Sequence, residues 1–523
     1  MSQYNTKTTG QNVVTNFRGG TAVRQTDEIA LISLLATGLT KMFHEAKDDR
    51  EKRLLDLMDA VAKKDKYLVA QMLVYARTIL AQRTVTHRGA VHMASLISGE
   101  SWGKRFFSKR NRKVNEGGIV YRLDDMLEIA ACYFAVNPEK PLSNPMKRGF
   151  KMALESADAY ELAKYKNDNK SVSLVDLVNL VHPKGGRNAE ALKQLVEGTL
   201  KQHNTAEDKQ SNAVQVVAGK VKSGEITVEE GELELKAAKG ENWKELIVNK
   251  TIGYLALLRN LRNIIIDAPE LITITGELIT DREFIRKSLV FPHQIDLALE
   301  VILNEIRTPE GRRLLPFLNQ AYENSVINLK ELNMDEHTAV VIDTSGSMFS
   351  SYGNGLVING KPTRNRFPIE KASLIGATLA KGLGADMYQF SSTCKSIAYN
   401  PNDSINTIKW NVLHQEGHVG HSTNFNEIFR TLNNSRGYAR IFIISDLQGA
   451  DNITRGSEYQ TYMGKFGRPY LYTVDLTGHG TNMFKANERL FQLVGYSASI
   501  YETAKLYETD FNALLTEIRK III

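Results

Sequence analysis

The chain has 523 residues, of which 42% are hydrophobic and 24% charged, and its formal net charge is +7. This length exceeds what one ordinary hydrophobic core holds, so we expect two or more domains. No apolar run reaches the roughly 20 residues of a membrane-spanning helix, and the polar start MSQYNTKTTGQNVV lacks the apolar core of a signal peptide. Cys132 and Cys394 follow no metal or redox spacing, so we predict two buried, reduced thiols in a cytoplasmic protein without membrane contact.

Residues 25–335 show helical periodicity almost throughout. Apolar residues recur every three or four positions in segments such as DEIALISLLATGLTKMF and YLVAQMLVYARTIL, which predicts an α-solenoid of degenerate helical pairs. Residues 205–243 are more polar and charged, and we expect them to leave the stack as an exposed excursion. Residues 1–333 carry 48 Lys and Arg against 42 Asp and Glu, so an anionic partner is expected on this part.

The pattern changes near residue 336. Short apolar segments, TAVVID, ADMYQFS, ARIFIISD and RPYLYTVDL, alternate with helical segments such as IEKASLIGATLAKGL and NFNEIFRTLNN. This alternation predicts a doubly wound α/β domain, with a parallel sheet whose binding site lies at the carboxyl ends of the strands. We therefore expect a helical domain over residues 1–335 and an α/β domain over residues 336–523. Its charges nearly balance, with 18 Lys and Arg against 17 Asp and Glu from Met334 onward.

Hydroxyl and carboxylate side chains follow the predicted strands of the α/β domain. The first strand ends in Asp-x-Ser-x-Ser, a later loop supplies Thr423, and the segment IISD supplies a second aspartate. Hard divalent cations prefer oxygen ligands, and Mg²⁺ keeps several waters. The sequence thus predicts a Mg²⁺ site at Asp343, Ser345, Ser347, Thr423 and Asp446, with Gly346 allowing a tight turn and Asp446 acting through water. The alternative is that Asp343 and Ser345 cap a helix.

Two neighbouring segments imitate other ligand sites. GLVINGKPT, residues 355–363, is one residue from a phosphate-binding P-loop, but Pro362 stands where a hydroxyl should hold Mg²⁺, so we interpret it as a loop. His414, His418 and His421 have no cysteine or suitably spaced fourth ligand beside them, which argues against zinc.

The predicted Mg²⁺ loops resemble the metal-ion-dependent adhesion site of von Willebrand factor A domains. The helical half is similar to the TROVE module of Ro ribonucleoproteins, including the bacterial Rsr group, over NFRGG (residues 16–20), AKYKNDNKSVSLVDLVNLVHPK (163–184), LLRNLRNI (257–264) and FPHQIDLALE (291–300). The order of the two parts matches as well. One departure is GHVGHST, residues 417–423, where the family commonly has a shorter Gly-Gly-Thr turn, so the placement of Thr423 stays open.

The resemblance implies a fold and a function. Helical repeats of the HEAT type would close into a ring, with the A domain joining its two ends. Y-like small noncoding RNA would bind the outer surface, and single-stranded ends of misfolded or structured RNA would enter the central hole, for RNA quality control, processing or decay. Such a protein would be a monomer without catalytic activity, and an exoribonuclease such as polynucleotide phosphorylase is an implied partner.

The resemblance also implies RNA-binding residues. NPMKRGFKMAL places Lys147, Arg148 and Lys151 on the helix that lines the hole in the family, and the basic positions that follow correspond to Lys164, Lys166, His182 and Lys184. For any one of these residues, a solvated helix face is an equally good interpretation.

A second basic segment is visible from charge alone. KRFFSKRNRK carries six cations around two phenylalanines, and cations neutralise phosphates while aromatic rings stack on unpaired bases. We predict an RNA surface here, formed by Lys104, Arg105, Lys109, Arg110, Arg112 and Lys113 and extended by His87 and Arg88. Phe106 and Phe107 are expected in the core.

Two further function classes remain open. In one, the helical half merely presents a metal-dependent protein-interaction module. In the other, the metal site hydrolyses a phosphoester, which the absence of paired metal carboxylates and a positioned general base argues against.

Overall fold

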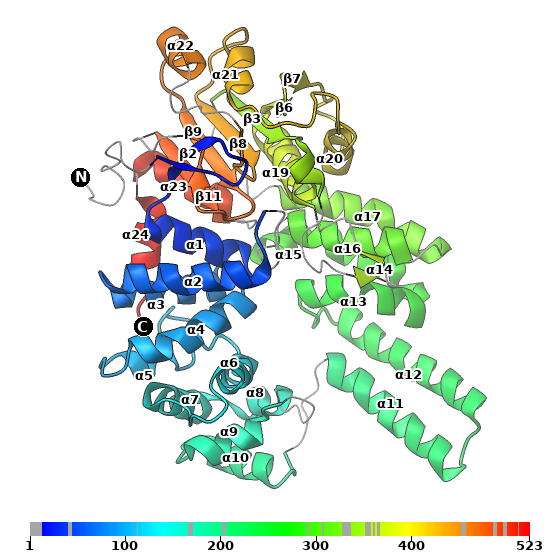
Figure 1. Ribbon diagram of the computed structural model, residues 1–523. Helices are drawn as coiled ribbons and strands as arrows, with labels where there is room; N and C mark the ends of the chain where they lie inside the picture. The colour runs from blue at the N-terminus through cyan, green and yellow to red at the C-terminus, as the bar shows by residue number, and fades with distance from the viewer. Residues whose placement is uncertain are drawn as a thin grey trace.

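The computed structural model describes residues 13–523 except 40–43, 112, 166–170, 201–205, 289, 291, 306–307, 327–335, 351–356, 359–360, 363–366, 451–456, 485–488, 495–498 and 511. Two helical arms lie below an α/β part in the view of Figure 1. The helix-rich first half and the sheet-containing second half confirm the predicted change of fold near residue 336.

In its described residues, the first arm contains ten helices in chain order. They are α1 (Asp27–Thr37), α2 (Lys47–Ala62), α3 (Lys66–Thr78), α4 (Thr84–Leu96), α5 (Gly103–Phe106), α6 (Leu123–Val136), α7 (Asn144–Ser156), α8 (Ala159–Lys164), α9 (Leu174–Val181) and α10 (Ala189–Val196). Several begin at a side-chain cap, because the first amides of a helix lack partners. The Asp65 carboxylate accepts from Leu68 N at 2.9 Å, and Ser173 forms a reciprocal capping box with Asp176. Consecutive helices pack on each other, as the predicted solenoid requires.

The second arm returns toward the α/β part. It consists of α11 (Ala206–Ser223), α12 (Val228–Val248), α13 (Tyr254–Asp267), the 3₁₀ turn η1 (Pro269–Leu271), α14 (Ile272–Thr280), α15 (Arg282–Lys287), α16 (Pro292–Glu305) and α17 (Pro309–Ser325). Helices α11 and α12 form an antiparallel hairpin that projects from the rest of the arm in Figure 1. This hairpin is the excursion predicted for residues 205–243.

The α/β part contains a six-stranded sheet. Its elements are β3 (Thr338–Asp343), the 3₁₀ turn η2 (Gly346–Phe349), β4 (Val357–Ile358), β5 (Lys361–Pro362), α19 (Pro368–Leu383), β6 (Asp386–Phe390), β7 (Cys394–Ile397), α20 (Ile405–Leu413), α21 (Asn426–Leu432), β8 (Arg440–Ser445), α22 (Ser457–Phe466), β9 (Tyr470–Asp475), β10 (Thr481–Asn482), β11 (Leu490–Val494), α23 (Ser499–Thr509) and α24 (Ala513–Arg519). The strand order is β11-β9-β8-β3-β6-β7, with only β7 antiparallel to its neighbour.

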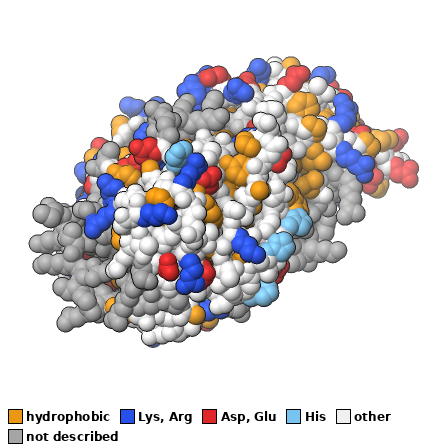
Figure 2. Space-filling view, turned by 90° about the horizontal axis from the view of Figure 1, so that it is seen from above, with side chains coloured by type: hydrophobic (Ala, Val, Ile, Leu, Met, Phe, Trp, Pro, Cys, Tyr) orange, Lys and Arg blue, Asp and Glu red, His pale blue; other side chains and the backbone are white. Residues whose placement is uncertain are grey.

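Both faces of this sheet are buried. Successive side chains of a strand point to opposite faces, and the β3 residues divide accordingly: Val340 and Ile342 join the core that includes α19, whereas Ala339 and Val341 join the core that includes α21. Such double coverage explains why the strands are continuously apolar rather than alternating. Seen from above, Lys, Arg, Asp and Glu side chains are interspersed on this part, in keeping with its balanced charge (Figure 2).

Both chain ends cross the predicted domain boundary. The N-terminal hairpin of β1 (Val13–Thr15) and β2 (Thr21–Arg24) pairs with β10 of the α/β part. The Asn16 side chain donates to Gly449 O at 2.7 Å, and a Cβ atom on Gly20 would lie 2.1 Å from that same oxygen, which explains the glycine. At the other end, Gln71 of α3 donates to the carbonyls of Arg519 and Ile521.

The first arm is fastened to the α/β part by a buried arginine. The Arg50 guanidinium donates to Thr477 O at 2.8 Å, to Gly38 O and to the Glu45 carboxylate. Its neighbour Arg53 donates to Gly478 O at 2.7 Å. These bonds satisfy carbonyl groups of the α/β part and pair both guanidinium groups with Glu45, so the ionic cluster stabilises the junction.

The second arm is fastened by a buried lysine. Lys409 Nζ, on α20, lies 2.7 and 2.9 Å from the two carboxylate oxygens of Asp296, on α16. Tyr322 on α17 donates to the same carboxylate at 3.0 Å. Each arm therefore has its own polar joint to the α/β part.

The structure also shows the two cysteines and the segment GLVINGKPT. Cys394 is buried and Cys132 is half-buried, and both are free thiols. GLVINGKPT, expected as a loop, contains the short β4-β5 hairpin and lacks the strand-to-helix turn of a phosphate-binding loop in its described residues. Among the described residues, no helix is both long and apolar enough to cross a membrane.

Candidate metal centre and nucleic-acid interface

The five predicted metal ligands lie on three loops at the carboxyl edge of the sheet. Asp343 is the last residue of β3, and Ser345 and Ser347 lie at the adjoining turn η2. Thr423 precedes α21, and Asp446 directly follows β8. All five are buried. The sheet topology brings them together because parallel strands end at one edge.

Hydrogen bonds fix the three loops to one another. Gly346 N donates to His421 O at 3.2 Å, and Ala450 N donates to Thr423 O at the same distance. The Ser345 and Ser347 hydroxyls lie 3.2 Å apart. The longer turn before Thr423 therefore still places this residue beside the other two loops.

Hydrogen bonds hold the two carboxylates in place. Asp343 accepts from Ser345 N at 2.9 Å and from the Ser445 hydroxyl at 2.5 Å, whereas Asp446 accepts from Gln448 N at 3.0 Å. Burial raises the pKa of both carboxyl groups, and their mutual repulsion raises that of Asp343 further. A bound cation would offset the free-energy cost of ionising these buried carboxyl groups.

Two buried oxygen atoms among the five predicted ligands have no hydrogen-bond partner in the described part of the chain. They are Thr423 Oγ1 and Asp446 Oδ2. Buried oxygens normally have partners, and a hard cation with bound water would supply them. The helix-cap alternative receives no support, because the Ser345 side chain makes no capping bond to η2. The donor set therefore fits a divalent cation such as Mg²⁺.

Sequence reasoning missed two residues beside this centre. Asp475 ends β9, and its negative charge raises the pKa of Asp446. Arg18, from the N-terminal hairpin, acts in the opposite direction on the same carboxyl group. The strand-end rule that identified Asp343 and Asp446 could have found Asp475, which follows the apolar run YLYTV. Nothing in the sequence near Arg18 indicated its position.

One detail of the predicted centre needs correction, and the rejected zinc site gains no support. Gly346 does not have a positive φ, and a Cβ atom there would meet only His421 O at 3.8 Å, so the turn does not require glycine. His414 and His418 form hydrogen bonds to Trp410 O and to the Gln415 side chain through Nδ1. In the described part of the chain, no three His, Cys, Asp or Glu side chains are grouped as metal ligands would be, so the zinc alternative gains nothing.

The helix α7 separates apolar and basic residues. Gly149 and Phe150 face α5, where a Cβ atom on Gly149 would lie 2.6 Å from Lys104 O. Lys147, Arg148 and Lys151 lie outside this buried face and form no ion pair with another described residue. The arrangement leaves three cations available on one helix.

Three more predicted RNA contacts lie on neighbouring elements. Lys184 donates its backbone N–H to the Glu155 carboxylate on the last turn of α7. His182 ends α9 with a φ of 47° and is exposed. Lys164 is exposed and lies over the rings of Tyr160 and Tyr165. Lys166, the fourth residue of this group, lies outside the described residues.

The segment KRFFSKRNRK is only partly a basic surface. Phe106 and Phe107 are fully buried, as expected for core residues. Arg110 is a correction: it is buried and donates to Gly117 O and Ile522 O, so it has a structural role. Lys109 forms an ion pair with Glu161. Lys104, Arg105 and Lys113 are exposed, and Arg112 lies outside the described residues.

His87 and Arg88 do not extend this surface, which is a second correction. His87 is buried between the carboxylates of Asp125 and Glu128, at 3.1 Å from each. These hydrogen bonds raise the pKa of His87 against the opposing effect of burial. Arg88 pairs with Glu51 of α2. Both side chains join helices of the first arm to one another.

The metal centre makes a prediction about pH. In chelator, we expect the apparent melting temperature to fall by several degrees as the pH rises from 5 to 8, because the folded protein holds protons on Asp343, with a pKa of about 7, and Asp446, with a pKa of about 6. The unfolded carboxyl groups release theirs near pH 4, so deprotonation destabilises only the folded state. Saturating Mg²⁺ is expected to remove this loss.

Asp343→Asn provides the control for this measurement, which scanning calorimetry would supply. At pH 8 in chelator the variant is expected to melt at a higher temperature than the parent, and Mg²⁺ should leave it unchanged. If the melting temperatures of the parent and the variant depended on pH in the same way, Asp343 and Asp446 would not repel each other in the folded protein.

Comparisons with known proteins agree with the two-part architecture. Residues 217–345, from α11 to the first metal loop, match the model of the TROVE domain family. The fold is similar to that of the RO (RSR) protein of Deinococcus radiodurans, with a TM-score of 0.51, 17% identity, and coverage of 95% of this chain and 100% of that chain. At this identity the likeness concerns the fold alone. No curated protein sequence matches. The segments LLRNLRNI and FPHQIDLALE lie inside the matched range, whereas NFRGG and residues 163–184 lie outside it.

Proposed function

From the premise that the chain is a Ro-like TROVE protein, we propose that it binds RNA without catalysing its cleavage. Structured or misfolded RNA would offer a single-stranded end to an opening between the two arms, and Y-like small RNA would bind the outer surface. The RNA would thereby be sorted for processing or decay, for which a partner exoribonuclease such as polynucleotide phosphorylase would supply the hydrolytic or phosphorolytic activity.

The basic face of α7 is the observation that carries this proposal. Lys147, Arg148 and Lys151 lie on the solvent side of a helix whose other side is packed against α5. Such cations neutralise phosphates without reading sequence, which suits a protein that accepts varied RNA ends. Lys184, tied to the last turn of α7, and the exposed Lys164, stacked on tyrosines, would continue the track.

The arrangement of the arms supports a ring. The helical array begins at the Arg50 joint and ends at the Lys409 joint, and both joints lie on the same α/β part. Attachment of both ends to one body is what a closed ring requires. We propose that this ring encloses the RNA opening and that the protein acts as a cytoplasmic monomer.

The metal centre would hold Mg²⁺ and serve binding rather than hydrolysis. Asp343, Ser345, Ser347 and Thr423 would contact the ion, and Asp446 would contact it through water. These residues would hold an ion that neutralises the buried carboxylates and that would accept an oxygen ligand from a partner. A second candidate function, a metal-dependent protein-interaction scaffold, is favoured by Thr423 Oγ1 and Asp446 Oδ2, which have no hydrogen-bond partner among the residues that the structure describes.

Equilibrium binding of the full chain to one RNA hairpin tests the proposal. The hairpin carries either a single-stranded 3′ tail or a blunt end, and binding is measured at moderate salt by fluorescence anisotropy. We expect the tailed RNA to bind more tightly, without RNA shortening and with Asp343→Ala binding as well as the parent. Equal, weak binding of both RNAs would contradict the proposal. Loss of RNA binding in Asp343→Ala would show that RNA binding depends on the metal centre.

A further inference from the structure

Three neighbouring strands of the sheet end side by side at the metal centre. In the parallel pairs β3–β8 and β8–β9, Ile342 lies opposite Ile444 and Ser445 lies opposite Asp475. Asp343, Ser445 and Asp475 therefore form a row at the ends of adjacent strands, which are about 4.8 Å apart. Aligned residues of neighbouring strands point to the same face, and the Ser445 hydroxyl donates to Asp343 Oδ2 at 2.5 Å. The Asp475 side chain thus belongs to the same face as that of the metal ligand Asp343.

Only one oxygen of the Asp475 carboxylate has hydrogen-bond partners among the described residues. Asp475 is 1% exposed, and its Oδ1 accepts from Thr477 N at 3.0 Å and from Gly478 N at 2.7 Å. Its Oδ2 is buried and has no such partner in the described part of the chain. Buried oxygens normally accept hydrogen bonds, in some cases from ordered water. Asp475 therefore has one oxygen that fixes the loop and one that requires a further donor.

The charged groups around Asp475 leave its carboxylate without a direct ion pair among the described residues. The Arg50 guanidinium interacts with Asp475 electrostatically, but it donates to the Glu45 carboxylate and to backbone carbonyls. The His479 ring is also close, yet neither of its nitrogens has a hydrogen-bond partner in the described part of the chain. The negative charge of Asp475 raises the pKa of Asp446. Asp475 is thus a third buried acid beside the two carboxylates of the centre, and a cation would offset their repulsion.

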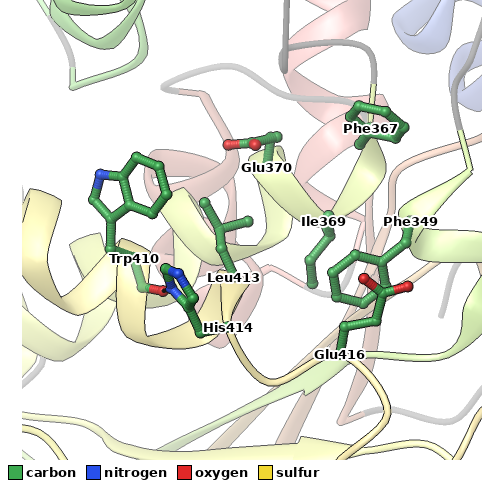
Figure 3. A pocket seen from close by; sticks show the side chains of 8 residues that line it. All are labelled: Phe349, Phe367, Ile369, Glu370, Trp410, Leu413, His414 and Glu416. Carbon is green, nitrogen blue, oxygen red and sulfur yellow. Dashed lines mark hydrogen bonds between the residues drawn. The ribbon is translucent and has the colours of Figure 1, made fainter.

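Two other carboxylates near η2 do not extend this row. Glu370 and Glu416 line a pocket between η2, α19 and α20, and Figure 3 shows them on different sides of its apolar centre. Glu370 belongs to α19 and forms an ion pair with Lys409 at 3.5 Å. Glu416 follows α20 and lines the pocket together with Phe349, the last residue of η2. Neither comes from a strand end, whereas the sheet itself places Asp475 beside the centre.

We propose that Asp475 is a further, water-mediated ligand of the cation centre. The inference rests on the proposed metal centre and adds a residue to it. Hard ions such as Mg²⁺ keep several waters, and these waters need acceptors. Carboxylates that accept hydrogen bonds from the ligands of a metal orient those ligands and strengthen metal binding. Asp475 Oδ2 supplies such an acceptor, and its charge adds to those of Asp343 and Asp446.

The same carboxylate connects the centre to the joint of the first arm. Asp475 Oδ1 accepts from the amides of Thr477 and Gly478, and the carbonyls of these two residues accept from Arg50 and Arg53. An ion that fixes the Asp475 side chain would thereby order the loop to which the arm is fastened. The cation would then stabilise the junction as well as serve a partner.

Binding of Mn²⁺ to the full chain, followed by the electron paramagnetic resonance signal of the free ion, tests the inference. Mn²⁺ shares the preference of Mg²⁺ for carboxylate and water ligands. The difference between the parent and Asp343→Ala isolates this centre from weak surface sites. We expect Asp475→Asn, which keeps Oδ1 for the loop amides, to weaken Mn²⁺ binding at the centre about tenfold. Competition by Tb³⁺ in the same titration should show a loss on the order of 30-fold, because the attraction of a charge grows with the charge of the ion.

Two other acid variants serve as controls. Asp386→Asn removes a carboxylate at the opposite edge of the sheet, where β6 begins, and Glu416→Gln removes the exposed acid of the pocket. Each should change the Mn²⁺ affinity by less than about twofold, because water and salt screen exposed charges. Unchanged Mn²⁺ affinity in Asp475→Asn would overturn the inference, and so would equal losses for Mn²⁺ and Tb³⁺, which indicate a distorted loop. A parent that binds Mn²⁺ no better than Asp343→Ala would overturn the metal centre itself, and the inference with it.

Discussion

Lys409→Met is expected to lower the stability of the protein by about 3–5 kcal/mol, the cost of leaving a buried carboxylate without its partner. Asp296, which is buried, would keep the hydrogen bond from Tyr322 but lose its ion pair, and Glu370 would lose its ion pair with Lys409 as well. The affected joint is the one that connects the second arm to the α/β part. The loss should therefore appear as earlier separation of this arm, seen as proteolysis near α16 and α17 at lower denaturant concentration.

Lys395→Met is the matched control. Lys395 is exposed on the edge strand β7 of the same sheet, and the substitution should change stability by less than about 0.5 kcal/mol. The double variant Asp296→Asn/Lys409→Met also removes the unpaired Asp296 carboxylate. It is expected to recover part of the stability lost in Lys409→Met. Urea unfolding followed by circular dichroism measures all three variants. A Lys409→Met protein as stable as the control would show that the buried pair does not hold the joint.

Neutralising the basic face of α7 is expected to have the largest effect on RNA binding. The triple variant Lys147→Gln/Arg148→Gln/Lys151→Gln removes three cations, so the slope of log affinity against log salt should fall by about 2 for single-stranded RNA. At low salt we expect a loss of about 10- to 100-fold for a tailed RNA hairpin. Anisotropy titrations at several salt concentrations measure both quantities.

A triple variant with the same change in net charge serves as the control. Lys395, Arg436 and Lys520 are exposed cations of the α/β part, and their replacement by glutamine should leave the salt slope nearly unchanged. If both triple variants lost the same affinity, the RNA would be attracted by the overall charge of the chain and not by α7.

The secondary structure and the position of Asp343 and Asp446 at strand ends could be predicted because their signals are local. A continuously apolar strand such as TAVVI is buried on both faces, and the polar Asp343 directly after it marks the strand end. The topology of a parallel sheet then brings Asp446 to the same edge, although the two residues are 103 positions apart. The prediction that Phe106 and Phe107 are buried is also confirmed, because large aromatic side chains are usually buried in the core.

The failures concern cations whose partners are distant in sequence. His87 was assigned to a surface, but its partner Asp125 lies on α6, and the pair is buried where α3, α4 and α6 meet. Arg110 was assigned to the same surface, but it reaches the carbonyl of Ile522 at the other end of the chain. A charged side chain can be exposed or paired in a junction, and only the tertiary arrangement distinguishes the two. The same limit concealed the joints made by Arg50 and Lys409.

Mapping of crosslinks between the full chain and a tailed RNA hairpin tests the central claim most directly. Ultraviolet irradiation of an RNA with 4-thiouridine in its tail, followed by mass spectrometry, identifies the residues in contact with the single strand. We expect crosslinked peptides from the region between Lys147 and Lys184. An excess of unlabelled tailed RNA should abolish these crosslinks, whereas the same stem without a tail should not. Crosslinks confined to the α/β part would contradict the account.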